Sequence, residues 1–219
     1  MRKLSFNHFP EPLKQISSCP SELYYEGNIS LIEKRSITIV GTRSITEYGR
    51  WVIEYLLDNF LKDLKVVVVS GLARGVDAYV HKTCLERNIQ TVAIVPGSIE
   101  SYIPKSNREI FKEIKKKGLV LAEFPKGIYF QKKMFVLRNR LLAAISGSTL
   151  VIEAGSKSGS LITAGLALDY NREVYIIPGE IRNKMSQGCN ILAKQGANVI
   201  TSLEDFKEIF SVQKNQIYF

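Results

Sequence analysis

Short, nearly continuous apolar runs alternate along the chain with longer segments in which apolar residues recur at helical spacing. The runs at 37–40, 66–69 and 91–95 are rich in valine and isoleucine, which is typical of parallel strands buried on both faces. Segments with apolar residues at every third or fourth position follow these runs and predict amphipathic helices. The alternation predicts an α/β fold, a doubly wound and mostly parallel sheet flanked by helices.

The pattern also divides the chain. The predicted strands span residues 37–40, 66–70, 91–95, 119–122, 149–152, 174–177 and 198–200. The predicted helices span residues 47–62, 75–87, 107–117, 135–145, 160–170, 187–195 and 203–210. Residues 1–35 lack the alternation and contain Pro10, Pro12 and Pro20, so we expect an irregular N-terminal lead-in. One core domain is predicted at 36–210, followed by a short C-terminal tail at 211–219.

The chain shows no sign of export or of a metal site. It has no stretch of about 18 apolar residues, and its N-terminus lacks the apolar run of a signal peptide. Cys19, Cys84 and Cys189 lie far apart without Cys-x-x-Cys spacing, which argues against a disulfide framework and against a zinc site. His8 and His81 have no acidic neighbours at ligand spacing. We expect a cytoplasmic protein without a metal, whose cysteines are small buried apolar residues.

Three predicted strands end in a loop that combines glycine, a hydroxyl group and a cation. The loops are Gly41-Thr42-Arg43-Ser44, Ser70-Gly71-Leu72-Ala73-Arg74-Gly75 and Gly155-Ser156-Lys157-Ser158-Gly159-Ser160. Backbone N–H groups, hydroxyls and a cation at one point suit a phosphate, especially where the loop opens a helix. Because the carboxyl ends of parallel strands share one edge of a sheet, we expect the loops to converge on one anionic ligand.

Each loop also has a simpler explanation. Glycine after a strand is often only a tight turn, and Ser or Thr at that position is often only a helix cap. Neither the Walker A sequence nor the Gly-x-Gly-x-x-Gly fingerprint occurs in the chain. ATP hydrolysis and NAD chemistry therefore lack their usual signature, and the sequence predicts no cofactor.

The charge balance favours a polyanionic partner. The chain has 30 Lys and Arg against 21 Asp and Glu, a formal net charge of +9. The run Lys112–Lys117 says little, because it fits the solvated face of a helix. Residues 124–135 are more informative, since they combine lysines with aromatic rings and are followed by Arg138 and Arg140. Cations along the backbone and rings on which bases stack are the means by which proteins hold single strands.

The aromatic stretch leaves two assignments open. Its rings are Phe124, Tyr129, Phe130 and Phe135. They are either stacking surfaces or core residues under a loop, and Tyr129 and Phe135 are the two that we expect to be exposed. Arg138 and Arg140 lie two positions apart and so cannot face the same side of a helix. We therefore expect one of these arginines to be structural.

Three carboxylates beside the basic loops permit a catalytic interpretation. Glu123 and Glu153 end strands, and Asp77 lies in the first turn of a predicted helix, so in an enzyme they would be general acids or bases. Alternatively, each glutamate pairs with a nearby arginine and orients it, and Asp77 stabilises its helix N-terminus. We favour the second interpretation.

Several segments together carry a specific resemblance. They are Ile39-Val40-Gly41-Thr42-Arg43 with Tyr48-Gly49, Ser70 to Asp77 with His81, Ala122-Glu123-Phe124-Pro125-Lys126-Gly127, Arg138-Asn139-Arg140, Val151 to Ala164, and Ile177-Pro178-Gly179 with Gly188-Cys189-Asn190. In this order and spacing, from about Leu23 to Ile200, the chain resembles the DNA-processing protein A family, also called Smf.

The resemblance implies an extended Rossmann-like domain that binds single-stranded DNA and is not an enzyme. It also implies a homodimer that protects incoming strands and loads the RecA recombinase onto them during natural transformation. By the same resemblance, Arg43, either Lys132 or Lys133, and the loop Lys157–Ser160 contact DNA. Many relatives carry a helical domain before the core and a winged-helix-like domain behind it. Here about 35 residues precede the first strand and about 19 follow the last, so the resemblance gives no ground for the functions of those domains.

The loops, the aromatic stretch and the resemblance give one set of candidate DNA-binding residues. The set is Gly41, Thr42, Arg43, Ser70, Gly71, Arg74, Lys132, Lys133, Phe135, Arg138, Arg140, Lys157, Ser158, Gly159 and Ser160.

Two other functions compete with this interpretation. A phosphoribohydrolase of similar fold would need Pro-Gly-Gly-x-Gly-Thr-x-x-Glu, which the third loop does not match. A pure interaction module would touch DNA only weakly and would depend on its partner for recruitment.

Overall fold

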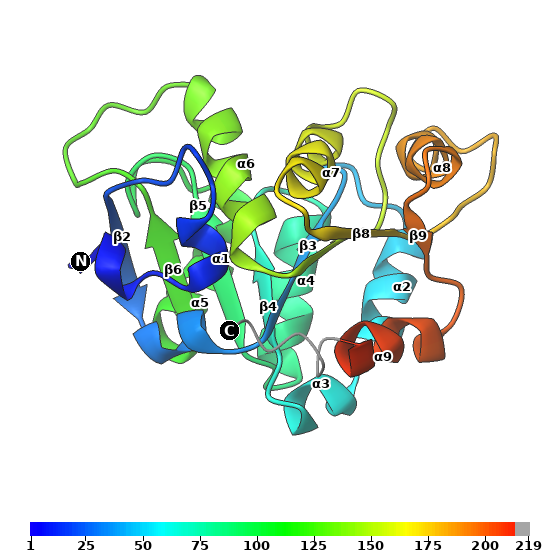
Figure 1. The fold of residues 1–219 in the computed structure, drawn as a ribbon, viewed down its shortest axis with the longest axis horizontal. Coiled ribbons are helices and arrows are strands. Elements are labelled where there is room, and N and C mark those ends of the chain that lie inside the picture. Colours follow the sequence, from blue (N-terminus) through cyan, green and yellow to red (C-terminus); the bar gives the residue numbers. More distant parts are fainter. Residues whose placement is uncertain (213–219) are drawn as a thin grey trace.

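A nine-stranded sheet runs through the part of the chain that the computed structural model describes, residues 1–212 (Figure 1). The strands lie in the order β1-β2-β6-β5-β4-β3-β7-β8-β9. Seven of them are parallel neighbours: β3 (Ser36–Val40), β4 (Val67–Ser70), β5 (Thr91–Val95), β6 (Leu119–Ala122), β7 (Ser148–Val151), β8 (Glu173–Ile176) and β9 (Asn198–Val199). The predicted doubly wound, mostly parallel α/β sheet is confirmed.

The strand order contains a reversal. From β3 the chain builds outward through β4, β5 and β6, and it then returns to place β7 on the other side of β3. In doubly wound sheets, such a switch point opens a crevice at the carboxyl ends of the two adjacent strands. Here the switch point lies between β3 and β7, which are the strands that precede the Arg43 loop and the Lys157 loop.

The N-terminal segment is not the irregular lead-in that we expected. β1 (Arg2–Ser5) and β2 (Glu22–Gly27) are antiparallel to each other, and β2 extends the sheet beside β6. The prolines lie between these strands, around η1 (Phe6–His8) and α1 (Glu11–Lys14). β1 is an edge strand without a fully buried residue, so it lacks the continuous apolar run that revealed the inner strands.

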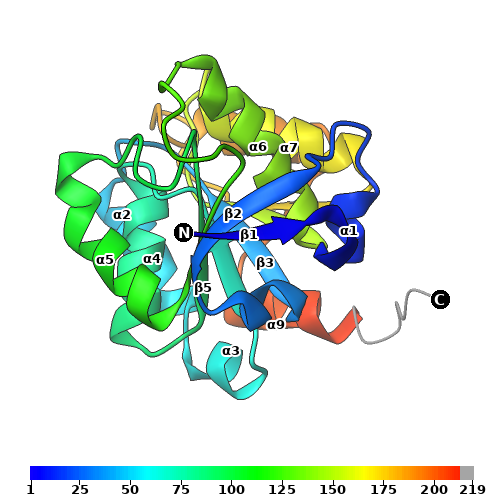
Figure 2. The ribbon, with the colours of Figure 1, turned by 90° about the vertical axis from the view of Figure 1, so that its left-hand side faces the viewer.

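Helices cover both faces of the sheet (Figures 1 and 2). They are α2 (Glu47–Leu56), α3 (Asn59–Asp63), α4 (Val76–Glu86), α5 (Arg108–Lys117), α6 (Lys133–Ile145), α7 (Gly159–Asp169), α8 (Gln187–Lys194) and α9 (Leu203–Val212), with 3-10 turns η2 (Ile29–Glu33) and η3 (Lys105–Asn107). The helix expected at 47–62 is interrupted at Leu57, because the Asp58 carboxylate accepts the backbone N–H of Asn59 and starts α3. Of the expected tail, residues 211 and 212 belong to α9, and residues 213–219 lie outside the described residues.

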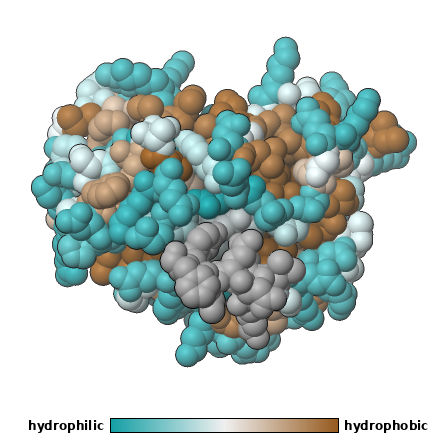
Figure 3. Space-filling view, in the orientation of Figure 1, coloured by the Kyte–Doolittle hydropathy of each residue, from teal (hydrophilic) through white to brown (hydrophobic). Residues whose placement is uncertain are grey.

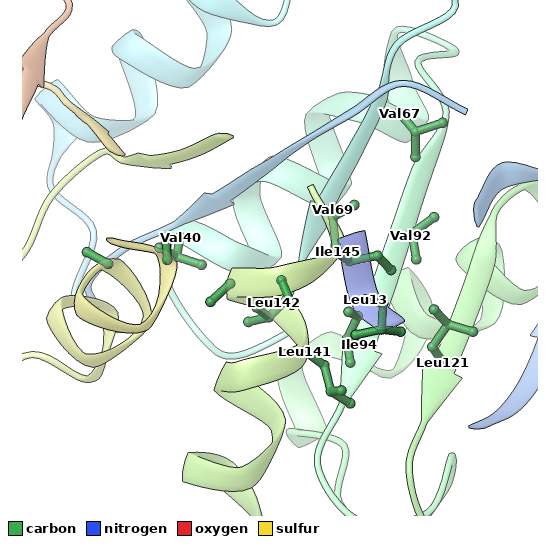
Figure 4. Packing of buried hydrophobic residues seen from close by; sticks show 14 of the residues in the cluster. Leu13, Val40, Val67, Val69, Val92, Ile94, Leu121, Leu141, Leu142 and Ile145 are labelled. Carbon is green, nitrogen blue, oxygen red and sulfur yellow. The ribbon is translucent and has the colours of Figure 1, made fainter. Parts of the chain in front are cut away.

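Alternate side chains of each inner strand serve two different cores. Val67 and Val69 pack with Leu141 and Leu142 of α6 on one face of the sheet (Figure 4), whereas Val68 packs toward α2 and α4 on the other. Burial on both faces explains why these strands are continuous apolar runs rather than alternating ones.

The cysteines and one histidine illustrate how thiol and imidazole groups are buried in the fold. Cys84 and Cys189 are buried free thiols, as expected, and Cys19 is partly buried. His81 is fully buried, with its Nδ1 atom 2.7 Å from the Thr91 hydroxyl, and burial lowers its pKa to about 3.

Among residues 1–212, no helix combines the length and apolar character needed to cross a membrane.

Candidate nucleic-acid interface

A cleft of about 690 Å³ lies where β3 and β7 end. The loops after both strands, the N-terminal half of α6 and the loop between β8 and α8 line it. The candidate residues that line it are Gly41, Thr42, Arg43, Phe135, Arg138, Lys157, Ser158, Gly159 and Ser160. The convergence expected of the first and third basic loops is therefore present, and we call this site the switch-point cleft.

The loop after β3 is held by hydrogen bonds to Glu153 and to Val76 of α4. The backbone N–H of Thr42 donates to the Glu153 carbonyl at 2.6 Å, and the Thr42 carbonyl accepts from the N–H of Val76 at 3.0 Å. A Cβ atom added to Gly41 would lie 2.6 Å from a methyl carbon of Val76. Gly75, whose φ is +79°, would with a Cβ approach the Thr42 carbonyl to 2.3 Å. Glycine at these two positions lets α4 pack directly against the loop.

Glu153 fixes the same loop from the other side. Its side chain accepts the backbone N–H of Thr46 at 2.9 Å and also the Thr46 hydroxyl. Thr46 in turn caps α2 by accepting the N–H of Gly49. The expectation that Glu153 pairs with an arginine is wrong, because a capping threonine of the neighbouring loop takes its carboxylate.

Arg43 is the side chain that this rigid loop presents. It is exposed, and its guanidinium carbon lies 5.0 Å from the centroid of the Phe135 ring. The contact holds a delocalised cation over an aromatic face at the mouth of the cleft. Five N–H donors on a planar group suit bidentate binding of phosphate oxygens.

The loop after β7 is more open. Ser158 caps α7, and its hydroxyl accepts the backbone N–H of Ser160 at 3.3 Å. Lys157 is exposed, and a Cβ atom added to Gly159 would meet no atom within 4 Å. The first turn of α7 thus faces the cleft with N–H groups, hydroxyls and the positive end of a helix dipole.

Two buried side chains of opposite charge, Arg138 and Asp77, form the floor of the cleft. Arg138 is 5% exposed, and its Nη1 atom donates to the Ile94 carbonyl at 2.9 Å. Burial lowers the pKa of Arg138 to about 10, so the side chain stays charged at neutral pH, with Asp77 opposing the shift. Burial raises the pKa of Asp77, which the charge of Arg138 and the backbone N–H of Ala73 counteract. The floor therefore carries a desolvated cation whose charge Asp77 balances.

The second basic loop, Ser70 to Gly75, supports the floor of the cleft and does not contribute a cation to its mouth. A Cβ atom on Gly71 would fall 1.5 Å from Nη1 of Arg138, so the glycine leaves room for the guanidinium. The Ser70 hydroxyl is buried and donates to the Ile39 carbonyl at 2.7 Å. Arg74 is exposed and does not line the cleft. Of the three loops, this one contributes space and support.

Three further candidates lie outside the cleft. Lys132 and Lys133 are exposed where α6 begins. Arg140 is ion-paired with Glu123, which confirms the expected role of that glutamate. Arg140 is thus a structural arginine, whereas Arg138 lines the cleft.

The aromatic stretch is divided between packing and exposure. Tyr129 is 85% exposed, as expected, but Phe135 is only half-buried rather than free. Phe135 meets Phe130 edge-on at 5.4 Å between centroids, and Phe130 stacks on Tyr102 at 4.5 Å. The three rings brace the start of α6 beside the cleft.

The sequence interpretation missed one wall of the cleft. Lys184, Met185 and Gln187, from the segment between β8 and α8, line it. A signal was available, because this loop follows β8, the strand next to β7, and so reaches the same edge of the sheet. Within residues 1–212, no three His, Cys, Asp or Glu side chains gather closely enough to hold a metal ion.

Comparison with known proteins gives the family and the fold of the chain. The model of the family described as DNA recombination-mediator protein A matches residues 3–211. The chain belongs to that family. The DNA processing protein DprA of Streptococcus pneumoniae is 34% identical over 197 residues, which cover 90% of this chain and 69% of that protein. Protein Smf of Synechocystis is 38% identical over 199 residues, 89% of this chain, and the chain spans only half of its length.

Solved structures of DNA recombination-mediator protein A relatives share the fold. The DNA processing protein A structure from Streptococcus pneumoniae has a TM-score of 0.87 at 32% identity, covering 94% of this chain and 73% of that one. DNA processing protein A from Helicobacter pylori, whose structure is described as giving insight into a single-stranded DNA binding mode, also has a TM-score of 0.87, at 28% identity and 97% coverage of both chains. The resemblance and the Rossmann-like fold predicted from the sequence are confirmed.

Proposed function

We propose that the switch-point cleft binds single-stranded DNA. The observation that carries the proposal is that Arg43, Lys157 and the N-terminus of α7 come from two strand ends and line one cleft. These groups provide a bidentate donor, a point charge and a backbone anion site for successive phosphates. The single-stranded DNA binding described for the Helicobacter pylori relative, which has the same fold, supports the assignment.

The path of the strand follows from the exposed cations. A phosphate at the first turn of α7 would lie opposite Arg43, and a base leaving it would meet the Phe135 ring under that guanidinium. Beyond Phe135, the exposed Lys132 and Lys133 at the start of α6 would continue the basic track. The two lysines thus extend the site rather than form it.

We infer that the protein binds DNA without transforming it. Asp77 is the sole carboxylate among the described residues that line the cleft, and it is buried on the floor, where it accepts the backbone N–H of Ala73. The Glu153 carboxylate accepts hydrogen bonds from the backbone N–H and the hydroxyl of Thr46. A phosphoribohydrolase needs a carboxylate that is free to act on a sugar. Incubation with nucleoside monophosphates should release no free base, and base release would revive the enzymatic alternative.

The wider role is proposed from the family. A cytoplasmic homodimer would protect incoming single strands and load RecA onto them. We expect pairing to use exposed apolar side chains such as Leu168 of α7, Ile191 of α8 and Val199 of the edge strand β9. Apolar side chains lie among polar ones on the side of the molecule where α7 and α8 are found (Figure 3). Ile191→Glu should shift a dimer to monomer in sedimentation, and loading would be measured as RecA assembly on strands coated with the protein.

The binding proposal is tested by comparing strand types across a salt series. Single strands should bind more tightly than duplex of equal length and with little sequence preference, because none of the helices within residues 1–212 is presented as a major-groove reader and the aromatic groups need unpaired bases. The logarithm of affinity should fall linearly with the logarithm of salt concentration, with a slope of about 0.7 for each phosphate contacted. Equal affinity for the two forms would contradict the proposal.

A further inference from the structure

The outer side of α2 carries three exposed aromatic side chains. Tyr48, Trp51 and Tyr55 are 41%, 56% and 42% exposed, while the opposite side of the helix, with Val52 and Leu56, is buried in the core. We call these three residues the aromatic ladder. Their spacing of three and four positions places them on one face, over about 10 Å of helix.

The rings of the ladder are nearly parallel. Centroids are 6.2 Å apart for Tyr48 and Trp51 and 5.1 Å for Trp51 and Tyr55, with interplanar angles of 20° and 7°. Parallel rings in contact lie about 3.5–4 Å apart, so a 5.1 Å centroid separation is an offset stack. Trp51 stacks on both tyrosines, so a nucleobase can use the outer faces of Tyr48 and Tyr55 and the parts of the rings that the offset leaves uncovered.

The ladder is continuous with the switch-point cleft. The Tyr48 hydroxyl donates to the Pro178 carbonyl at 3.0 Å, and Pro178 lies near the start of the segment between β8 and α8. Lys184 and Met185 of that segment line the cleft. From the other direction, the loop that carries Arg43 leads directly into α2. A strand that leaves the cleft over this segment arrives at Tyr48.

We propose that the aromatic ladder is a second binding site, a stacking platform for the unpaired bases of a strand that continues out of the cleft. The proposal rests on the function proposed above. It commits to bases rather than phosphates, because α2 carries Glu47 and Glu54, and its Arg50 lies over the Tyr79 ring at 4.9 Å. Duplex DNA hides its base faces, so the ladder adds to the preference for single strands.

The chain contains its own probe for this site. Trp51 is the only tryptophan among the 219 residues, so its emission reports on the ladder alone. Oligothymidylates of about six and about 20 nucleotides would be titrated, the shorter near the low end of single-strand site sizes. Both should bind, and only the longer should quench Trp51, as a base stacks on the ladder next to the indole. Saturable binding of the longer strand with unchanged emission would overturn the proposal.

Variants at Trp51 test the energetic contribution. Trp51→Ala should weaken binding of the longer strand about fivefold to a hundredfold, the value of one base stacked on an aromatic ring, and should leave the shorter strand unaffected. The salt slope should stay at the wild-type value, because no phosphate contact is lost. Trp51→Phe keeps a ring and should restore most of the affinity.

The remaining outcomes separate the ladder from the cleft. If Trp51→Ala binds the longer strand with wild-type affinity while Arg43→Ala binds neither strand, the ladder is refuted as a binding site. The cleft would then remain the proposed DNA-binding site. Failure of the wild-type protein to bind either strand would refute both. Self-association without DNA that disappears in Trp51→Ala, measured by sedimentation, would show that the ladder is a contact between copies and would also overturn the proposal.

Discussion

The loops after β3 and β7 face each other across one cleft but are built in opposite ways. The loop at Gly41–Ser44 is held by α4 through Gly41 and Gly75, and by Glu153 through Thr46. The loop at Gly155–Ser160 is closed by its own serine cap and has open space around Gly159. The first loop therefore fixes where a cation stands, and the second leaves room for a ligand to approach backbone N–H groups.

The difference has a consequence for how substitutions act. In the β3 loop, a substitution of Gly41 should lower the stability of the protein, because the Val76 side chain and the Glu153 carbonyl already fill the space beside it. In the β7 loop, a substitution of Gly159 should lower the affinity for DNA instead, because the new side chain would displace no atom of the protein. Affinity and stability, measured on the same variants, therefore test whether the two loops differ in this way.

The largest effect is expected from Gly159→Asp. A carboxylate at the first turn of α7 would stand where a phosphate binds, and like charges about 4 Å apart repel by several kcal/mol, so affinity should fall about 100-fold or more. The matched control is Gly159→Ala, which adds a methyl group without charge and should bind nearly as wild type. Binding would be measured by fluorescence anisotropy. A folded Gly159→Asp protein with normal affinity would show that the loop is only a helix cap.

Arg43→Ala should have the next largest effect. It removes a bidentate donor to phosphate, and hydrogen bonds to charged groups contribute about 1.5–3 kcal/mol, so affinity should fall about 10- to 100-fold. Arg74→Ala is the control, since Arg74 is also an exposed loop arginine but does not line the cleft. A larger loss in Arg74→Ala than in Arg43→Ala would place the strand outside the cleft.

Gly41→Ala should reduce stability more than affinity. Its methyl group would lie 2.6 Å from a Val76 carbon and 2.9 Å from the Glu153 carbonyl oxygen. Forcing such overlap typically costs about 1–3 kcal/mol, whereas Gly159→Ala should stay within about 1 kcal/mol of wild type. Urea unfolding of both variants measures the difference. Equal unfolding free energies would mean that the two loops are equally constrained.

Lys157→Ala should have the smallest effect. Lys157 is a flexible point charge beside the backbone anion site, so its loss should lower the slope of log affinity against log salt by about 0.7, the value for one phosphate of a single strand. Lys112→Ala is the control, because Lys112 pairs with Glu109 on α5, outside the cleft. An unchanged slope for Lys157→Ala would exclude a phosphate contact by this lysine.

Much of the sheet was predictable because its inner strands are buried on both faces. Runs such as Val66–Val69 have no other simple explanation, and once the strands were placed, parallel topology brought Arg43 and Lys157 to one edge. β1 and β2 were missed because β1 has no buried residue and β2 has only one, so neither forms a continuous apolar run. The break at Leu57 depends on a local cap by Asp58, which periodicity does not reveal.

The site was less predictable than the sheet, because loop residues of the same type have different roles, some structural and some in the proposed binding of the ligand. Ser70 and Gly71 resemble a phosphate loop in sequence, yet one supports β3 and the other makes space for Arg138. The partner of Glu153 proved to be Thr46, a choice fixed by how the β3 loop folds over β7. Lys184 has no motif around it and is placed only by the path between β8 and α8.

A crystal structure of the chain with a short oligothymidylate would test most directly whether the two loops hold the same strand. The account predicts one phosphate on the backbone N–H groups of the first turn of α7 and a second within hydrogen-bond distance of the Arg43 guanidinium, both on one DNA chain in the cleft. A strand bound along Lys132 and Lys133 with the cleft empty, or held by one loop alone, would contradict it.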